Sequence, residues 1–187
     1  CDIAVIHLDA SATSLIGGTY VGGSGNDGLN QFTPLLRNYG DPFRGEIIMD
    51  QAENPIVITS TTSTNLFTTP GAVQSTFGGG LDAYLFRLDP LLTTMSWATY
   101  YGGSGNDAGF GVQISSTGEI YATGGTQSAD LLMAGTPASG ALAGQVDGFI
   151  ARFSADGSTL LSSTYLGTTE FDQSYFVQLD TQDDVYV

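Results

Sequence analysis

The sequence predicts an all-β protein made of repeated four-stranded antiparallel sheets, and three observations support this fold class. Glycine occurs 26 times in 187 residues and only 12% of the residues are charged. Of the 19 acidic residues, 15 are Asp, which favours turns over helices. The short segments between turn residues are rich in β-branched and aromatic side chains, and none shows sustained 3.6-residue apolar periodicity. The composition is the first of these observations and the strand-like segments are the second. The third is an internal repeat.

One unit occurs three times in the chain. Its copies are CDIAVIHLDASATSLIGGTYVGG from residue 1, LDAYLFRLDPLLTTMSWATYYGG from residue 81 and VDGFIARFSADGSTLLSSTYLGT from residue 146. In each copy an opening Asp lies 25 residues before an Asp that closes the next turn. A second block follows each unit, beginning near residues 45, 111 and 176. This period predicts four short strands per repeat, and long repeats of this kind are typical of propeller blades.

The hexapeptide GGSGND occurs twice, at 22–27 and at 102–107. The first copy, read on as GGSGNDGLN, fits the nonapeptide that binds calcium in parallel β-rolls. A roll needs tandem nonapeptides whose turns share ions, and copies 80 residues apart cannot do this. We therefore interpret GGSGND as a crossing turn between blades. Its glycines are expected to supply positive φ angles, and its Asp to accept hydrogen bonds from turn N–H groups.

The repeats predict a partial β-propeller of about three blades, in which the strand after each crossing turn is innermost. Because a closed propeller needs more blades, we expect the chain to be a fragment of one propeller domain, with the rest of that propeller as its neighbour. The expected parts are the outer two strands of a blade at 1–27, an insertion at 28–44, complete blades at 45–101 and 110–166, and the start of another blade at 174–187.

Several segments resemble the SBBP (seven-bladed β-propeller) repeats of bacterial secreted and surface proteins. They are DAYLFRLDP from residue 82, SWATYYGGSGND from residue 96, EIYATGGTQS from residue 119 and FTTPGA from residue 67. The resemblance covers the chain except for 28–44 and the degenerate third turn at 167–172. Many such proteins of the Bacteroidetes carry gliding-motility or type IX secretion sorting domains. The resemblance therefore implies an extracellular or cell-surface location and the type IX secretion machinery as a partner.

Composition excludes several classes of partner. The formal net charge is −15, with four Arg and no Lys, which argues against nucleic acid and anionic membrane surfaces. No apolar run reaches the roughly 18 residues that span a bilayer, so membrane insertion is not expected. One cysteine, Cys1, cannot form an internal disulfide.

The connections that vary in length lie on alternate ends of the predicted strands. These are the insertion at 28–44 and the loops at 63–80 and 127–146, so all three are expected on one face. The candidate ligand-binding residues are Arg37, Asn38, Tyr39, Asp41, Phe43 and Arg44. Aromatic, Arg and amide side chains suit a carbohydrate or protein ligand. The favoured alternative is structural: the arginines pair with nearby Asp residues.

The paired Asp residues admit two interpretations. The candidates for a metal site are Asp2, Asp27, Asp82 and Asp107. Each pair could share a Ca²⁺ ion whose shell is completed by backbone carbonyls. The favoured alternative is that each Asp accepts hydrogen bonds within its turn. No metal is expected at Asp172, where the glycines of the third turn are lost.

The sequence favours a non-enzymatic extracellular binding, adhesion or display module. No catalytic residue is assigned, because His7 aligns with Arg87 and Arg152 at a basic position expected to face solvent. Trp97 is interpreted as a packing or surface residue. Two alternatives stay open: a propeller hydrolase or lyase acting on polysaccharide through Asp and Tyr side chains, and a purely structural spacer.

Overall fold

The computed structural model describes the backbone of residues 1–187 and every side chain except that of Thr33. The protein is all-β, as the sequence predicts, with 41% of residues in strands and 3% in helices. The helical residues are two single turns of 3-10 helix in the insertion, Thr33–Leu35 and Asp41–Phe43. Among the described residues no helix has the length and apolar character needed to cross a membrane.

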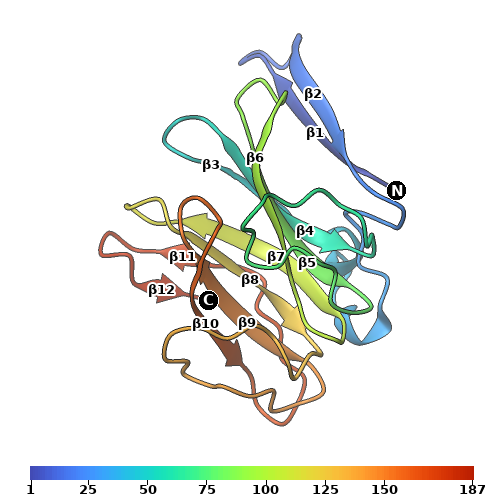
Figure 1. Cartoon of the computed structure of the whole chain (residues 1–187), viewed down its shortest axis with the longest axis vertical. Coiled ribbons are helices and arrows are strands. Elements are labelled where there is room, and N and C mark those ends of the chain that lie inside the picture. The colour runs from blue at the N-terminus through green and yellow to red at the C-terminus, as the bar shows by residue number, and fades with distance from the viewer.

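Two four-stranded antiparallel sheets form the centre of the molecule (Figure 1). The first blade consists of β3 (Glu46–Met49), β4 (Pro55–Thr61), β5 (Asp82–Leu88) and β6 (Met95–Tyr101). The second blade consists of β7 (Asp107–Ile114), β8 (Ile120–Thr126), β9 (Asp147–Phe153) and β10 (Leu160–Leu166). In both, the strands stand in chain order, as in propeller blades.

Two hairpins flank the blades. The N-terminal half blade is β1 (Ile3–Leu8) paired with β2 (Leu15–Val21), and the C-terminal half blade is β11 (Gln178–Leu179) paired with β12 (Val185–Tyr186). By the sequence repeat, the first corresponds to the outer strands of a blade and the second to the inner strands.

The second blade begins at Asp107, three residues before the expected start at 110. Asp107 and Ala108 already pair with Thr126 and Gly125, and a bulge between Gly109 and Gly111 follows. The glycine at 109 lets β7 approach the first blade, because a Cβ there would lie 2.7 Å from Ile58 Cγ1. The turn and the innermost strand are therefore continuous.

The core lies between the blades, not within one sheet. Strand β7 packs across β3, β4 and β5 of the first blade. All seven residues of β4 are buried, because neighbours cover both of its faces. This explains why its sequence, PIVITST, does not alternate between apolar and charged residues. A second core joins Val5 and Val21 of the N-terminal half blade to the aromatic residues of β5 and β6.

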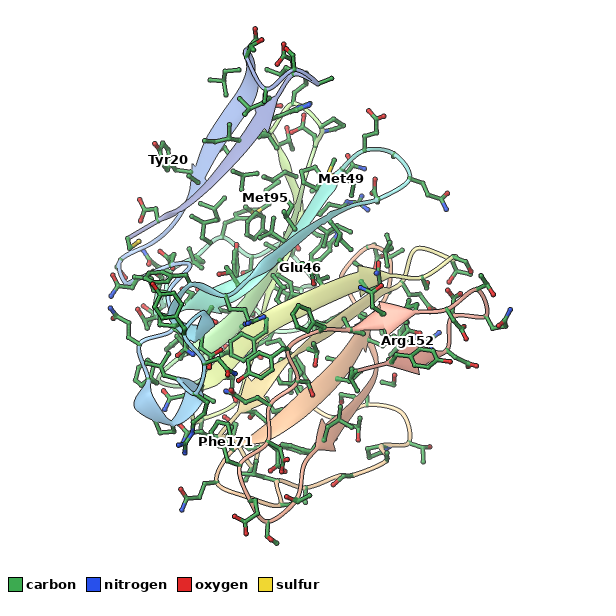
Figure 2. All side chains as sticks on the ribbon, turned by 180° about the vertical axis from the view of Figure 1, so that it is seen from behind. Tyr20, Glu46, Met49, Met95, Arg152 and Phe171 are labelled. Atoms are coloured by element: carbon green, nitrogen blue, oxygen red, sulfur yellow. The ribbon has the colours of Figure 1, made fainter. Side chains whose placement is uncertain are left out.

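One tyrosine of the repeat is buried in both complete blades and exposed in the N-terminal half blade. Tyr100 and Tyr165 are each 1% exposed, and their hydroxyls donate to the carbonyls of Ser63 and Ser128 at 2.9 Å. The aligned Tyr20 is 79% exposed and points away from the molecule in Figure 2.

The hairpin ends and the long connections lie on opposite sides of the sheets. Figure 1 shows the β3–β4, β5–β6 and β7–β8 turns at one end of the strands. The insertion at 28–44 lies at the other end. The loops at 63–80 and 127–146 start and finish at that end and run back along the outer strands, where they bond to β6 and β10. The three variable connections therefore begin from the same end of the strands, called here the loop face.

Candidate functional site

A buried carboxylate organises the insertion at 28–44. Asp41 is fully buried, and its Oδ2 accepts hydrogen bonds from the backbone N–H groups of Arg37 and Asn38, both at 2.7 Å. Its Oδ1 lies 3.7 Å from Nε of Arg44. Pro42 at the start of the second 3-10 turn supplies the φ angle that the turn needs. Of the candidate ligand-binding residues, Asp41 is thus the internal support of the loop.

Both arginines of the insertion stack on aromatic rings distant in the sequence. The Arg37 guanidinium lies 4.3 Å from the ring centroid of Phe171, which Figure 2 shows beside the insertion. The Arg44 guanidinium lies 4.6 Å from the Tyr175 centroid. Such contacts stabilise by roughly 0.5–2 kcal/mol. Arginine–Asp pairing, the structural interpretation of the sequence, holds for Arg44, whereas Arg37 lies on an aromatic ring.

Tyr175 links the insertion to the second blade. Its ring stacks on Phe110 of β7, with centroids 5.4 Å apart and planes at 14°. Its hydroxyl accepts from Nδ2 of Asn38 at 2.6 Å and donates to Oε1 of Gln173 at 2.7 Å. Burial raises the pKa of the Tyr175 hydroxyl, and the Asp41 carboxylate adds to that effect. The insertion is therefore fixed to β7 of the second blade through Tyr175.

Two aromatic side chains of the insertion face solvent. Tyr39 is 102% exposed relative to its reference, and Phe43 is 76% exposed. Phe43 also lines a groove of about 620 Å³, together with Ile3 of β1 and Ile47 of β3. The residues that can contact a ligand are thus Tyr39 and Phe43, flanked by the exposed Arg37 and Asn38.

Sequence reasoning missed the aromatic support under the insertion. Phe110, Phe171 and Tyr175 belong to the crossing regions of the second and third repeats, and no spacing relates them to residues 28–44. The only available signal was the aromatic cluster of the segment 171–176, FDQSYF, directly after the degenerate turn.

Each crossing turn is tied by its closing Asp. The N–H of the residue four positions earlier donates to that carboxylate in all three: Gly23 to Asp27 at 2.8 Å, Gly103 to Asp107 at 2.7 Å and Thr168 to Asp172 at 2.7 Å. In the first two turns the carboxylate also binds hydroxyls of the next blade. Asp27 accepts from Thr61 and Ser63, and Asp107 accepts from Thr126 and Ser128.

The glycines of GGSGND do not supply positive φ angles, so that expectation was wrong. The glycines with positive φ are Gly28, Gly71, Gly118, Gly135 and Gly157, and none belongs to a crossing turn. A Cβ on Gly23 or Gly103 would instead lie 2.7 or 2.6 Å from the Cβ of Ser63 or Ser128. The glycines are required because the turn lies directly against the loop after the next blade's second strand.

Two carboxylates meet beneath the second crossing turn. Asp82 and Asp107 are fully buried, and Asp82 Oδ1 and Asp107 Oδ2 lie 2.6 and 2.9 Å from the position of a Cβ on Gly102. Asp82 Oδ2 accepts from the Gly78 N–H at 2.8 Å and from Gln74 Nε2 at 3.0 Å, whereas its Oδ1 has no partner among the described atoms. Burial raises the pKa of Asp82 to about 7, and the charge of Asp107 contributes.

This pair does not fit a Ca²⁺ ion. Calcium takes six to eight oxygen ligands. Both oxygens of Asp107 are already held by O–H and N–H donors, whose positive ends would face a cation. No group of three or more His, Cys, Asp or Glu side chains suited to a metal occurs among the described residues. The environment of Asp82 favours a proton.

The remaining candidates have structural surroundings. Asp2 is exposed, and its carboxyl group lies against Gly22, as that of Asp82 lies against Gly102. His7 is half-buried, whereas the sequence predicted that it faces solvent. Its Nδ1 lies 2.9 Å from the carbonyl oxygen of Pro90. Trp97 is 3% exposed and packs on Gly157.

Comparison with known proteins shows no family for this chain. No family model matches the chain, and no curated protein matches it. The SBBP resemblance therefore stays a prediction from the sequence.

Proposed function

We propose that this chain is a non-enzymatic binding module of a larger bacterial surface or secreted protein, serving adhesion or display, with the insertion at 28–44 as its ligand surface. One observation carries the proposal. Tyr39 and Phe43 are exposed on a loop that buried Asp41 and the stacked arginines hold in one conformation.

Rigid display is what makes exposed aromatic rings effective in binding. Aromatic side chains offer a large contact area with few rotatable bonds, so little entropy is lost when a ligand orders them. The loop carrying them is already ordered through Tyr175 and Phe110 of the second blade. A mobile loop would lose more conformational entropy on binding.

The ligand class that the surface favours is uncharged carbohydrate. Sugar rings stack on exposed aromatic faces, and Asn38 stands beside Tyr39 as an amide donor and acceptor. A net charge of −15 disfavours anionic polysaccharides at low salt. Location outside the cell and contact with the type IX secretion machinery belong to the same proposal and are supported by the SBBP resemblance.

The hydrolase alternative has less support. A glycosidase needs two carboxyl groups that face the substrate, about 5–10 Å apart. Asp82 and Asp107 converge, but both are fully buried under the crossing turn. We therefore place the ligand on the loop face and propose no reaction.

The test is binding to an array of neutral and anionic polysaccharides, followed by titration calorimetry with each polysaccharide bound. The double variant Tyr39→Ala/Phe43→Ala should weaken binding at least tenfold, which corresponds to about 1.4 kcal/mol. The matched control is Phe67→Ala, because Phe67 is 55% exposed on a different loop. Retained binding by the double variant, or binding of none of the polysaccharides, would contradict the proposal. Binding of anionic polysaccharides alone would contradict the ligand class.

A further inference from the structure

Consecutive blades meet through an outer hairpin, the turn between the third and fourth strands of the following blade. The β5–β6 hairpin lies against the N-terminal half blade, where Nδ1 of His7 is 2.9 Å from the carbonyl oxygen of Pro90. The β9–β10 hairpin lies against the first blade, where Nη1 of Arg87 donates to the carbonyl oxygen of Ala155 at 3.5 Å. The two basic residues are equivalent in the repeat, and so are the two carbonyls. This polar contact is therefore common to both interfaces.

A second contact, between the fourth strand of one blade and the next outer hairpin, differs between the two interfaces. At the first, a Cβ on Gly17 of β2 would lie 2.7 Å from the Leu91 carbonyl oxygen and 3.9 Å from the Leu92 Cβ. At the second, a Cβ on Gly157 would lie 2.6 Å from Cδ2 of Trp97 of β6. The two strand residues are equivalent in the repeat, and so are Leu92 and Gly157. One interface thus pairs a small strand residue with a large hairpin residue, and the other reverses the sizes.

The backbone conformation does not explain the glycine at 157. Its φ is 68°, and the equivalent residues Ala12 and Leu92 have φ angles of 55° and 60° with side chains present. In all three hairpins the N–H of this residue donates to the carbonyl three positions earlier, at 2.8–3.0 Å. The left-handed position therefore tolerates a side chain in this turn, and the ring of Trp97 is what excludes one at Gly157.

Both large side chains lie in cores that two blades share. Leu92 is 5% exposed and belongs to the core that contains Val5 and Val21 of the N-terminal half blade. Trp97 is 3% exposed and belongs to the core that contains Phe153 of the second blade. Its indole N–H has no hydrogen-bond partner among the described atoms. The contact of Trp97 therefore depends on the size and shape of its ring.

We propose that this pair of positions specifies the order of the blades: the fourth strand of each blade accepts an outer hairpin whose left-handed residue matches it in size. The β5–β6 hairpin, with Leu92, fits beside Gly17 and would overlap with Trp97. The β9–β10 hairpin, with Gly157, fits Trp97 and would leave a void beside Gly17. Overlap and voids both destabilise close-packed interiors, so the size match separates hairpins that share the same polar contact. Such selection reduces misassembly of similar blades, which is a characteristic failure of repeat proteins.

Melting temperatures of a double-mutant cycle test the size match. Gly157→Leu should lower the melting temperature by at least about 6 °C, since the new side chain overlaps the ring of Trp97. The same change made in Trp97→Gly should cost at least about 4 °C less, because the space beside a glycine takes a leucine, as Gly17 and Leu92 show. Equal losses in the two backgrounds would overturn the proposal.

A second comparison does not require Trp97→Gly to fold. Gly157→Ala adds a methyl group 2.6 Å from Trp97 Cδ2, whereas the control Gly118→Ala, at a φ of 89° in the β7–β8 hairpin, adds one 3.5 Å from the Ala155 Cβ. Both variants carry the cost of a left-handed side chain, so Gly157→Ala should lower the melting temperature by at least about 4 °C more than the control. The chain contains one Trp, so its fluorescence emission should shift in Gly157→Ala and not in the control. Equal melting losses, or the same emission in both, would overturn the proposal. Neither readout depends on the carbohydrate ligand.

Discussion

The second and third crossing turns differ in what lies against them. Both end in an Asp that accepts the N–H of the residue four positions earlier. At 102–107 the turn lies on the loop after β8, and Asp107 is fully buried. At 167–172 it faces solvent, and Asp172 accepts only from the N–H and hydroxyl of Thr168. The shared Asp therefore maintains the turn, whereas the remaining contacts depend on the neighbour.

The glycines of the two turns differ as well: the first glycine is present in both turns and the second in only one of them. The first glycine is kept in both turns, because a Cβ on Gly102 or Gly167 would lie 2.6 or 2.5 Å from the carboxyl group of Asp82 or Asp147 of the same blade. The second glycine, Gly103, has Thr168 as its counterpart. In GTTEFD the position of the second glycine is thus occupied by a residue with a side chain, which packs against no counterpart of Ser128 among the described residues. The following predictions test this distinction, from the largest effect to the smallest.

Asp107→Ala should destabilise the protein by about 3 kcal/mol, because it leaves three buried donors without an acceptor at about 1 kcal/mol each. These donors are the Gly103 N–H and the hydroxyls of Thr126 and Ser128. Asp172→Ala should cost less than about 1 kcal/mol, since water can replace it. Urea unfolding measures both. Equal losses would mean that the neighbouring blade adds nothing.

Gly103 and Thr168 occupy the same position in the two turns, and exchanging them should cost unequal amounts of stability. Gly103→Thr should cost about 2 kcal/mol, because its Cβ would lie 2.6 Å from the Cβ of Ser128. The reverse change, Thr168→Gly, should cost less than about 1 kcal/mol through backbone entropy and the lost hydroxyl. If Gly103→Thr is tolerated as well as Thr168→Gly, close approach does not explain the glycine.

The buried Asp82 should make stability depend on pH. Burial raises its pKa to about 7 in the folded protein, against about 4 when unfolded. Between these two pKa values the folded state binds more protons than the unfolded state. The contribution of Asp82 to the free energy of unfolding is therefore full below about pH 4 and is lost as pH rises to about 7.

Asp82→Asn should reduce this fall, because an amide N–H can donate toward Asp107 without a charge. The fall that remains comes from Asp107, because burial raises the pKa of that carboxyl as well. At pH 8 we expect the melting temperature to rise by about 3 °C, the change that about 1 kcal/mol produces at this size. Asp147→Asn is the control, because both oxygens of Asp147 are hydrogen-bonded to N–H groups of residues 143 and 144. A fall between pH 4 and 7 that is undiminished in Asp82→Asn would assign it to another group.

Chelation should have the smallest effect. Because the crossing-turn carboxylates are held by protein donors, adding EDTA should leave the melting temperature unchanged within about 1 °C. A Ca²⁺ ion at a hundredfold excess over its Kd would stabilise the folded state by about 2.7 kcal/mol. A fall of several degrees that Ca²⁺ reverses, and that Asp107→Ala abolishes, would establish a metal site.

The sequence alone determined the blade pattern, because each part of it depends on neighbours in the chain. The repeat, the hairpin turns and the strand order follow from short-range spacing, and residues 45–101 match β3 to β6 within one residue. The start of β7 was missed because its pairing with β8 continues through a bulge.

Only the tertiary structure decided which residues each crossing turn and each candidate residue contact. Burial of Asp82 and Asp107, the exposure of Tyr39, and the stacking of Arg44 on Tyr175 all join segments far apart in the chain. Sequence spacing carries no information on such contacts, because loop closure costs grow only slowly with separation and allow many alternatives. Packing of whole blades selects among them, since a side chain's surroundings are set by the sheet next to it.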